Sequence, residues 1–529
     1  MHKDERVSRL LNDKKATRRE FMMGATALGF SAAAATSLWS SRAAAAPQRG
    51  GHMRAGLNDS NTIDSLDPAT FNATTMICIS RAFRDSLVEV GQDNTAKPTL
   101  AESWEASDDA KVWRFKLRNG VEFSNGKSLT TDDVIASINV HRGEDSKSGA
   151  KGVFAGISDV KADGKDVVEV SLAEANADFP FLMTDYHMNI VPSKDGKAEV
   201  LSDVGTGTYL LKRFEPGVRA DLERNPNAWQ SDFGFVDSVE LITILDDTAR
   251  ESALLTQDVD VINRPGLKTI NRLARVPHVN IVDVESNLAF THPMRIDVPP
   301  FGNNDFRMAL KHALPRQEFI DKILFGYGAI GNDQPLGPVF NNYDPDIKVE
   351  YDLDKAKSYL KKAGMENAKI TIHTSDTAYG GAVDAAQLFR EHFTKIGVDL
   401  TVTREPKDGY WSDVWNVKPF CSCYWGARPV EDMILSIAYI SGAPWNDTVI
   451  SIPRVDELVK AARGELDPAT RKGMYSEVQQ LLSTQGATLI PAFGKDVAAT
   501  SKKIGVGPEI GGGWEMDGGA FIKRWWIES

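Results

Sequence analysis

Hydrophobic residues alternate with polar ones along several short segments of the chain. The alternation over residues 113–117 resumes over 121–123, beyond Asn119-Gly120, a dipeptide that tolerates a positive φ. Such alternation is typical of half-buried strands, and the turn between the two segments predicts that they form a β-hairpin. Residues 167–172 and 239–245 are likewise predicted to be strands.

Apolar residues recur at helical spacing elsewhere, most of all in the second half of the chain. Residues that favour helix ends flank these segments: Thr131 is followed by two carboxylates, Pro315 suits a first turn, and Asp352 and Gly364 would cap one helix at both ends. Helices are therefore predicted after Thr131, over 305–312, after Pro315, between Asp352 and Gly364, and over 383–396, 455–463 and 468–482.

One part of the second half alternates between the two element types. A predicted strand over 369–373, the helix over 383–396 and a strand over 398–404 follow one another within about 35 residues. A strand, a helix and a strand in this order form a βαβ unit, in which the two strands are parallel. The expected fold class is α/β.

The first 45 residues differ from the rest. Residues 1–19 are polar and basic and end in Arg18-Arg19, residues 23–39 are weakly apolar, and Ala43-x-Ala45 follows. This is the order of an export signal with its cleavage site, and the arginine pair resembles the twin-arginine type. The other interpretation is a membrane anchor, for which about 17 apolar residues rich in Ala and Gly are marginal. We expect a periplasmic protein whose signal is cleaved near Ala45.

Composition and charge narrow the functional classes. With 42% hydrophobic and 25% charged residues, the 529-residue chain has the composition of a soluble globular protein of several domains. Its 61 basic and 73 acidic residues give a formal charge of −12, so we expect no nucleic-acid partner. Three cysteines are too few for a disulfide framework, although Cys421 or Cys423 could pair with Cys78.

Motifs of catalysis are absent from the sequence. It contains no Gly-x-Ser-x-Gly, no His-Glu-x-x-His and no phosphate-binding Gly-x-x-x-x-Gly-Lys pattern, and its nine histidines are scattered. Gly205-Thr206-Gly207 matches only the first three positions of a dinucleotide-binding fingerprint. We therefore expect no catalytic residue, no cofactor and no metal site.

Several longer segments resemble one protein family in order and spacing. The matching segments are Leu66-Asp67-Pro68, 98–104, 113–123, 129–134, 205–209, 223–229, 300–310 and 351–364. Together they resemble the extracellular solute-binding proteins of family 5, the peptide, nickel and opine receptors of ABC importers.

The resemblance implies a large periplasmic-binding-protein fold of the cluster C type, in which two lobes joined by a hinge are accompanied by an additional small domain. The expected boundaries are 1–45 for the signal peptide, 46–90, 201–290 and 501–529 for lobe I, 91–200 for the small domain and 291–500 for lobe II. Ligand would bind between the lobes, which close over it.

The resemblance also indicates residues that would face the ligand. In peptide-binding members, a Trp, two smaller residues and an Asp form a segment whose Asp pairs with the ligand's ammonium group. Here the segment contains Trp425, Gly426 and Ala427 and ends in Arg428. A cation at this position would repel an ammonium group and suit a carboxylate. The alternative is a surface arginine paired with Glu431 or Asp432.

Further candidates follow from the same resemblance. Trp445 and Asn446 match a segment that lines the ligand site, and Asn72 and Thr74 lie where peptide receptors surround the ligand. Thr206 and Thr208 match a segment of backbone and amide contacts, and His292 lies near the crossing into lobe II. The predicted ligand-binding residues are Arg428, Trp425, Trp445, Asn446, Asn72, Thr74, Thr206, Thr208 and His292.

Two functional classes stay open at this point. The first is a monomeric receptor that passes a small carboxylate-bearing solute, opine-like or amino-acid-derived, to an inner-membrane ABC permease, with a dipeptide or oligopeptide as the alternative ligand. The second is an enzyme or chaperone on the same scaffold, because a fold alone does not determine function. The absence of a catalytic motif favours the receptor.

Overall fold

A nine-stranded mixed sheet runs through the computed structural model, which describes residues 47–407, 409–443 and 445–528. The strand order is β10-β11-β12-β1-β13-β19-β14-β18, and β15 pairs with β19. Its strands are β1 (His52–Leu57), β10 (Tyr209–Glu215), β11 (Arg219–Arg224), β12 (Ser238–Thr243), β13 (Val261–Asn263), β14 (Val279–Pro293), β15 (Gly328–Ile330), β18 (Cys423–Trp425) and β19 (Thr488–Ser501).

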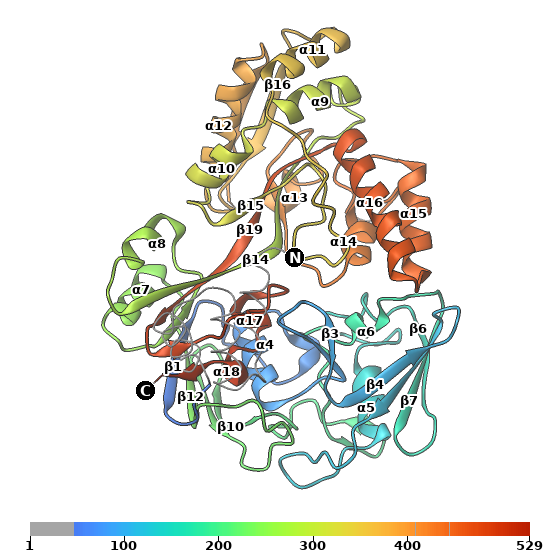
Figure 1. Ribbon diagram of the computed structural model, residues 1–529, viewed down its shortest axis with the longest axis vertical. Helices are drawn as coiled ribbons and strands as arrows, with labels where there is room; N and C mark the ends of the chain where they lie inside the picture. The colour runs from blue at the N-terminus through green and yellow to red at the C-terminus, as the bar shows by residue number, and fades with distance from the viewer. Residues whose placement is uncertain (1–46, 408, 444, 529) are drawn as a thin grey trace, which may run out of the picture.

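The part of the molecule at the lower left of Figure 1, here called the lower lobe, is built from distant segments. The helix α4 (Thr74–Phe83) is almost wholly buried and packs in one core with β1, β10 to β12 and the C-terminal segment. The other elements of the lower lobe are η1 (Pro68–Thr70), β2 (Val88–Val90), β3 (Ala96–Pro98), α7 (Asp247–Leu255), α8 (Leu267–Leu273), β20 (Ile504–Gly505), α17 (Glu515–Gly518), α18 (Phe521–Arg524) and β21 (Trp526–Ile527).

A separate antiparallel sheet of order β4-β5-β7-β6 forms what we call the small domain. Its elements are β4 (Ala101–Ala106), β5 (Val112–Leu117), α5 (Thr131–Val140), β6 (Ile157–Ala162), β7 (Val167–Leu172), α6 (Phe179–Leu182), β8 (Ser193–Lys194) and β9 (Lys197–Ala198). Trp113, Phe115 and Leu117 are buried, as their alternation predicts. The predicted hairpin is wrong, however, because β5 pairs with β4 and β7, whereas Glu122 bridges to Ser128.

The upper lobe, which is the part at the top of Figure 1 with α9 to α16, contains the βαβ unit that the sequence predicts. β16 (Lys369–Thr374) and β17 (Asp399–Arg404) are parallel neighbours joined by α12 (Ala382–Thr394). The predicted caps are also present, since the Asp352 side chain accepts from the Lys355 amide and Gly364 ends the helix with a φ of 68°. The remaining helices are α9 (Asn304–His312), α10 (Arg316–Lys322), α11 (Leu353–Ala363), α13 (Tyr410–Asp413), α14 (Glu431–Ala438), α15 (Pro453–Gly464) and α16 (Pro468–Gln485).

The long strands β14 and β19 run side by side from the lower lobe into the upper lobe (Figure 1). Their pairing is regular from Val279 opposite Ser501 to Glu285 opposite Lys495, and it resumes only at Ala289 opposite Phe493. The strand β14 therefore carries extra residues between these two pairs. Because a bulge of this kind bends a strand and interrupts its ladder, we expect any hinge motion between the lobes to occur at residues 286–288.

The three cysteines lie in two different cores and are all free. Cys78 is buried on α4 in the lower lobe, whereas Cys421 and Cys423 are buried in the upper lobe. Neither pairing with Cys78 that the sequence left open is formed. Within the described ranges, no helix is long and apolar enough to cross a membrane.

Candidate functional site

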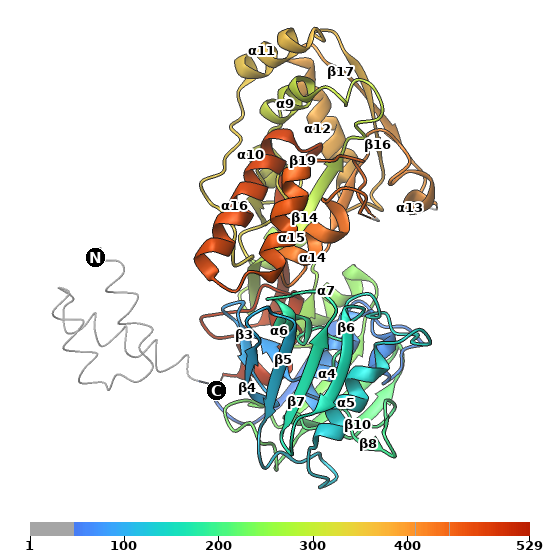
Figure 2. The same ribbon diagram turned by 90° about the vertical axis from the view of Figure 1, so that its right-hand side faces the viewer.

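A cavity of about 910 Å³ lies where the lower lobe, the small domain and the upper lobe meet. The lower lobe contributes α4 and residues 511–524, the small domain contributes residues between 149 and 187, and the upper lobe contributes the start of α14 and the loop before it. Figure 2 shows α14, α15 and α16 above the small domain. The residues that line the cavity come from parts of the chain that are far apart in sequence. Its volume is that of a drug-sized or peptide-sized binding site.

Arg428 lies on the upper wall of this cavity, in the loop between β18 and α14. Its Nη1 donates to the carbonyl oxygens of Gly426 (3.2 Å) and Ala427 (3.1 Å). Burial lowers the pKa of its guanidinium, and the nearby Tyr186 and Asp185 act in the opposite direction. A partly buried cation on a cavity wall is suited to binding an anionic group.

The ion pair that would have made Arg428 a surface residue is not formed. Glu431 instead accepts from the backbone and side chain of Asn342, at 2.7 and 3.1 Å. Asp432 pairs with Arg463 at 3.0 Å. Within the described part of the chain, Arg428 has no carboxylate within ion-pair distance.

The two predicted tryptophans differ in their exposure to the cavity. Trp445 is 42% exposed and lines it, whereas Trp425 is only 6% exposed and sits behind it on β18. Their ring centroids are 5.8 Å apart, and both rings contact Trp415 edge-on. Trp415 in turn donates from Nε1 to the buried Asp447 carboxylate at 2.9 Å. Trp425 thus supports the wall, and Trp445 forms part of its surface.

The structure gives the two predicted asparagines different places. Asn446 is buried, and its amide donates to the carbonyl oxygens of Ile440 (3.1 Å) and Ile450 (2.8 Å), so it shapes the loop that carries Trp445. Asn72 is exposed ahead of α4. Neither is among the described residues that line the cavity.

The three predicted threonines bond within the lower lobe or are buried there. Thr74 donates to Glu515, and Thr206 donates to Asp85 at 2.9 Å. The glycines around Thr206 pack against the end of α4: a Cβ at Gly205 would clash with the Phe83 carbonyl oxygen, so the segment is built for close packing and not for a dinucleotide. Thr208 is 2% exposed. None of the three is among the described residues on the cavity wall.

His292 belongs to the core of the upper lobe and not to the cavity. It is fully buried, its Nε2 lies 2.8 Å from the Tyr379 hydroxyl, and its ring packs edge-on against Phe389. Burial lowers its pKa to about 3, so the imidazole is neutral at physiological pH. Its position on β14 follows the expected crossing between lobes, but the side chain faces away into the apolar core.

Sequence reasoning missed several residues that line the cavity. They come from α4, from the loop after α6, from the hinge strand β14 and from the C-terminal segment: Arg81, Asp185, Tyr186, Asn287, Trp514 and Arg524. The rings of Tyr186 and Trp514 form part of one surface, since their centroids are 5.4 Å apart. No spacing in the sequence brings these positions together, so no motif could have revealed them.

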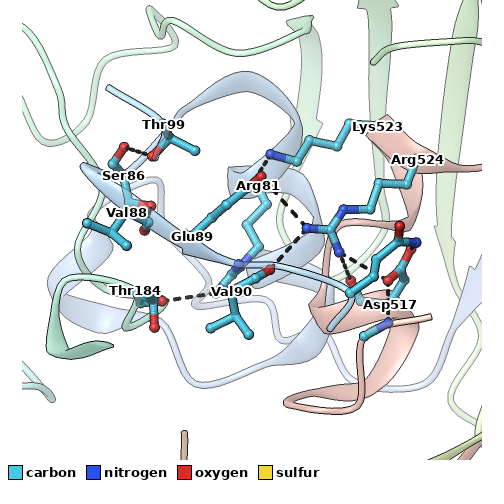
Figure 3. A network of polar contacts seen from close by, with 12 residues as sticks. Arg81, Ser86, Val88, Glu89, Val90, Thr99, Thr184, Asp517, Lys523 and Arg524 are labelled. Carbon is cyan, nitrogen blue, oxygen red and sulfur yellow. Dashed lines mark hydrogen bonds and ion pairs between the residues drawn. The ribbon is translucent and has the colours of Figure 1, made fainter. Parts of the chain in front are cut away.

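A network of charges supports the lower wall (Figure 3). Glu89 on β2 binds Lys523 at 2.5 Å and lies 3.8 Å from Arg524, while Arg524 also pairs with Asp517 at 3.0 Å. These cations lower the pKa of Glu89 against the effect of its burial. Arg81 is adjacent and donates from Nη2 to the Thr184 carbonyl at 3.1 Å. The lower wall therefore places three cations around two carboxylates.

Direct contacts join the small domain to the upper lobe at the rim of the cavity. Arg471 on α16 forms an ion pair with Asp178, and both side chains are largely buried. The Ala177 amide also donates to the Arg463 carbonyl at 2.7 Å. Within the described ranges, no group of three or more His, Cys, Asp or Glu residues is arranged to hold a metal ion.

Comparison with known proteins places the chain among binding proteins. The family model of the bacterial extracellular solute-binding proteins, family 5 middle, matches residues 95–447. The glutathione-binding protein GsiB of Salmonella typhimurium is 23% identical over 457 residues, covering 83% of this chain and 89% of that protein.

Solved structures share the fold over nearly the whole chain. DppA from Helicobacter pylori, in complex with the peptide STSA, matches with a TM-score of 0.70 and 22% identity, covering 91% of this chain and 99% of that one. AgaA from A. tumefaciens R10, in complex with agropinic acid, matches with a TM-score of 0.70 and 20% identity, covering 90% and 99%. The two-lobed fold expected from the sequence is thereby confirmed.

Proposed function

This chain belongs to family 5 of the bacterial extracellular solute-binding proteins, and from that premise we propose that it binds a small carboxylate-bearing solute, opine-like or amino-acid-derived. Its homologues are solute-binding proteins of ABC transporters and not enzymes. The cavity between the lobes is the proposed binding site, and its occupant would pass to the membrane permease.

The observation that carries the proposal is the placement of Arg428. It lies on the cavity wall with no carboxylate of the described chain within ion-pair distance, in a protein whose formal charge is −12. A guanidinium offers a planar fork of donors that matches a carboxylate, and partial burial strengthens the attraction. The same charge would disfavour the ammonium group of a cationic ligand.

The relatives support this chemical class. GsiB is named for glutathione, a peptide with two carboxylates, and AgaA was solved with agropinic acid, a carboxylic acid. A dipeptide or oligopeptide is the second candidate for this chain, favoured by the cavity volume of about 910 Å³ and by the acidic Asp185 on its wall, which could face an ammonium group. A peptide also carries a carboxylate, so Arg428 would keep its role.

Export and closure complete the proposal. The expected signal, residues 1–45, lies outside the described residues, and we propose a twin-arginine route with cleavage near Ala45. N-terminal sequencing of the mature protein should begin at Ala46, and a start far downstream would contradict this. The mature protein would act as a periplasmic monomer whose lobes close about the bulge in β14.

A thermal-shift screen tests the proposed class. The mature protein would be heated with opines, glutathione, dipeptides, amino acids, betaines and sugar acids, because a ligand that binds only the folded state raises the unfolding midpoint. We expect the opine-like and amino-acid-derived carboxylates to raise it, and the same compounds with their carboxylates esterified, added as controls, to leave it unchanged. The reverse selectivity, or turnover of a bound compound, would contradict the proposal.

A further inference from the structure

Arg81 faces the cavity from the lobe opposite Arg428. It lies in the last turn of α4 and lines the cavity from below. Its Nη2 donates to the Thr184 carbonyl at 3.1 Å, and its buried Nε has no hydrogen-bond partner. Among the described residues, no carboxylate lies within ion-pair distance of its guanidinium.

The carboxylates nearest to Arg81 are already bound by other groups. Figure 3 shows Glu89 held by Lys523, with Arg524 beside it and bound to Asp517. Asp185 accepts from the amide of His187 and lies 2.6 Å from its ring nitrogen. The acidic groups that act on the Arg81 charge from a distance thus have closer partners of their own.

The guanidinium charge of Arg81 is therefore not balanced by a neighbouring carboxylate. Burial lowers the pKa of Arg81, and its direct hydrogen-bond partner is a neutral carbonyl oxygen and not a carboxylate. A surface arginine at the end of a helix would need no explanation, because a cation there is stabilised by the helix dipole. A half-buried arginine that lines a ligand-sized cavity, with no carboxylate of the described chain in ion-pair distance, is suited to an anion that enters the cavity.

We propose that Arg81 forms a second anion-binding site in the cavity, so that the solute is a dicarboxylate held by Arg81 in the lower lobe and Arg428 in the upper lobe. This inference rests on the proposed function and names its substrate class. Two cations on facing walls repel each other, so a dianion between them would favour the closed arrangement more than a monoanion could.

Two other polar atoms of residues that line the cavity lack hydrogen-bond partners and refine the ligand class. Trp514 Nε1 is a donor, and Asn287 Oδ1 is an acceptor on a side chain that is only 5% exposed. The acceptor requires an N–H or O–H group on the ligand, since a buried oxygen without a partner is costly. A dicarboxylate with an amine, amide or hydroxyl between its acid groups meets all of these requirements.

Titration calorimetry with matched probes tests the second site. The probes would be glutathione against its monoethyl ester, in which one carboxylate is masked, and octopine against arginine, which lacks the carboxyethyl group and hence the second carboxylate of octopine. Arg81→Gln and Arg428→Gln would be compared, with Arg213→Gln as the control, because Arg213 is an exposed arginine paired with Glu215 on the surface of the lower lobe. Loss of one charged hydrogen bond corresponds to about tenfold or more in affinity.

We expect each of the two cavity variants to lower the affinity for the dicarboxylate by about tenfold or more. The affinity for the monocarboxylate should fall in only one of the two variants. If Arg81→Gln binds the dicarboxylate as the parent protein does, the second site is wrong although the proposed function stands. If only Arg428→Gln leaves the affinity for the dicarboxylate unchanged, the proposed function fails instead. Should Arg81→Gln not fold, Arg81→Lys must keep the preference for the dicarboxylate, and loss of that preference overturns the proposal.

Discussion

Asn287 in the bulge of the hinge strand donates a hydrogen bond from its side-chain amide to the backbone carbonyl of Arg428, at 3.3 Å. The segment that bends between the lobes is thereby tied to the loop that carries the proposed ligand contact. A change of strand geometry on closure would be transmitted to the position of the guanidinium.

Removing the hydrogen bond between Asn287 and Arg428 should weaken ligand binding more than it destabilises the fold. We expect Asn287→Ala to lower affinity by about two- to tenfold, which corresponds to one ordinary hydrogen bond. Asn287→Asp should weaken binding further, because it puts a carboxylate beside Arg428 that competes with the ligand. Calorimetric affinities with equal unfolding midpoints would support this role, and unchanged affinity in both variants would refute it.

Trp445 should report ligand binding by fluorescence. Its indole is 42% exposed on the cavity wall and would lose water when a ligand fills the cavity or the lobes close. We expect the ligand-induced emission change to be largely lost in Trp445→Phe and retained in Trp104→Phe, a control in the small domain. Retention of the full change in Trp445→Phe would mean that the cavity is not where the solute binds.

The buried pair between Arg471 and Asp178 should set the balance between open and closed states. It joins the small domain to the upper lobe at the cavity rim. Deleting one partner leaves the other charge buried and unpaired, which disfavours the closed contact. We expect Arg471→Ala to enlarge the radius of gyration of the unliganded protein in solution scattering. An unchanged radius would show that the contact does not govern closure.

Asp447 should make stability depend on pH. Burial raises its pKa to about 7, whereas an unfolded aspartate titrates near ~3.9. The folded protein therefore holds a proton that the unfolded chain releases, and the contribution of this group to stability falls as pH rises from about 4 to about 7. Asp447→Asn keeps an acceptor for Trp415 and should flatten this fall. Urea titrations at pH 5 and 7.5 measure the free energy of unfolding at each pH. An equal fall in this free energy between the two pH values in both proteins would contradict the assignment.

Local patterns predicted those elements whose ends are set by nearby residues. Asp352 and Gly364 cap α11 as expected, and β16, α12 and β17 form the predicted βαβ unit. The hairpin prediction failed because β5 is an inner strand whose two edges pair with β4 and β7, which leaves no edge for residues 121–123. The residue boundaries expected for the lobes and the small domain stay a prediction.

The site was only partly predictable, because local patterns do not reveal which distant segments meet. Arg428 and Trp445 could be found because they lie in segments that resemble the family, and both line the cavity. Arg81 has the spacing of a residue at the end of an amphipathic helix, and Asn287 is one polar residue in a long strand. Only the fold of the whole chain shows that these two positions share one cavity.

The most direct test of the account is titration calorimetry of Arg428→Ala with the solute that stabilises the parent protein best. Arg404→Gln is the control, because Arg404 is an exposed arginine on β17 of the same lobe. Loss of a charged hydrogen bond of roughly 1.5–3 kcal/mol predicts that affinity falls by about ten- to a hundredfold. Arg428→Lys should restore only part of it, because an ammonium cannot form the guanidinium fork. Binding by Arg428→Ala as tight as that of the parent protein would contradict the claim that Arg428 holds the carboxylate of the solute.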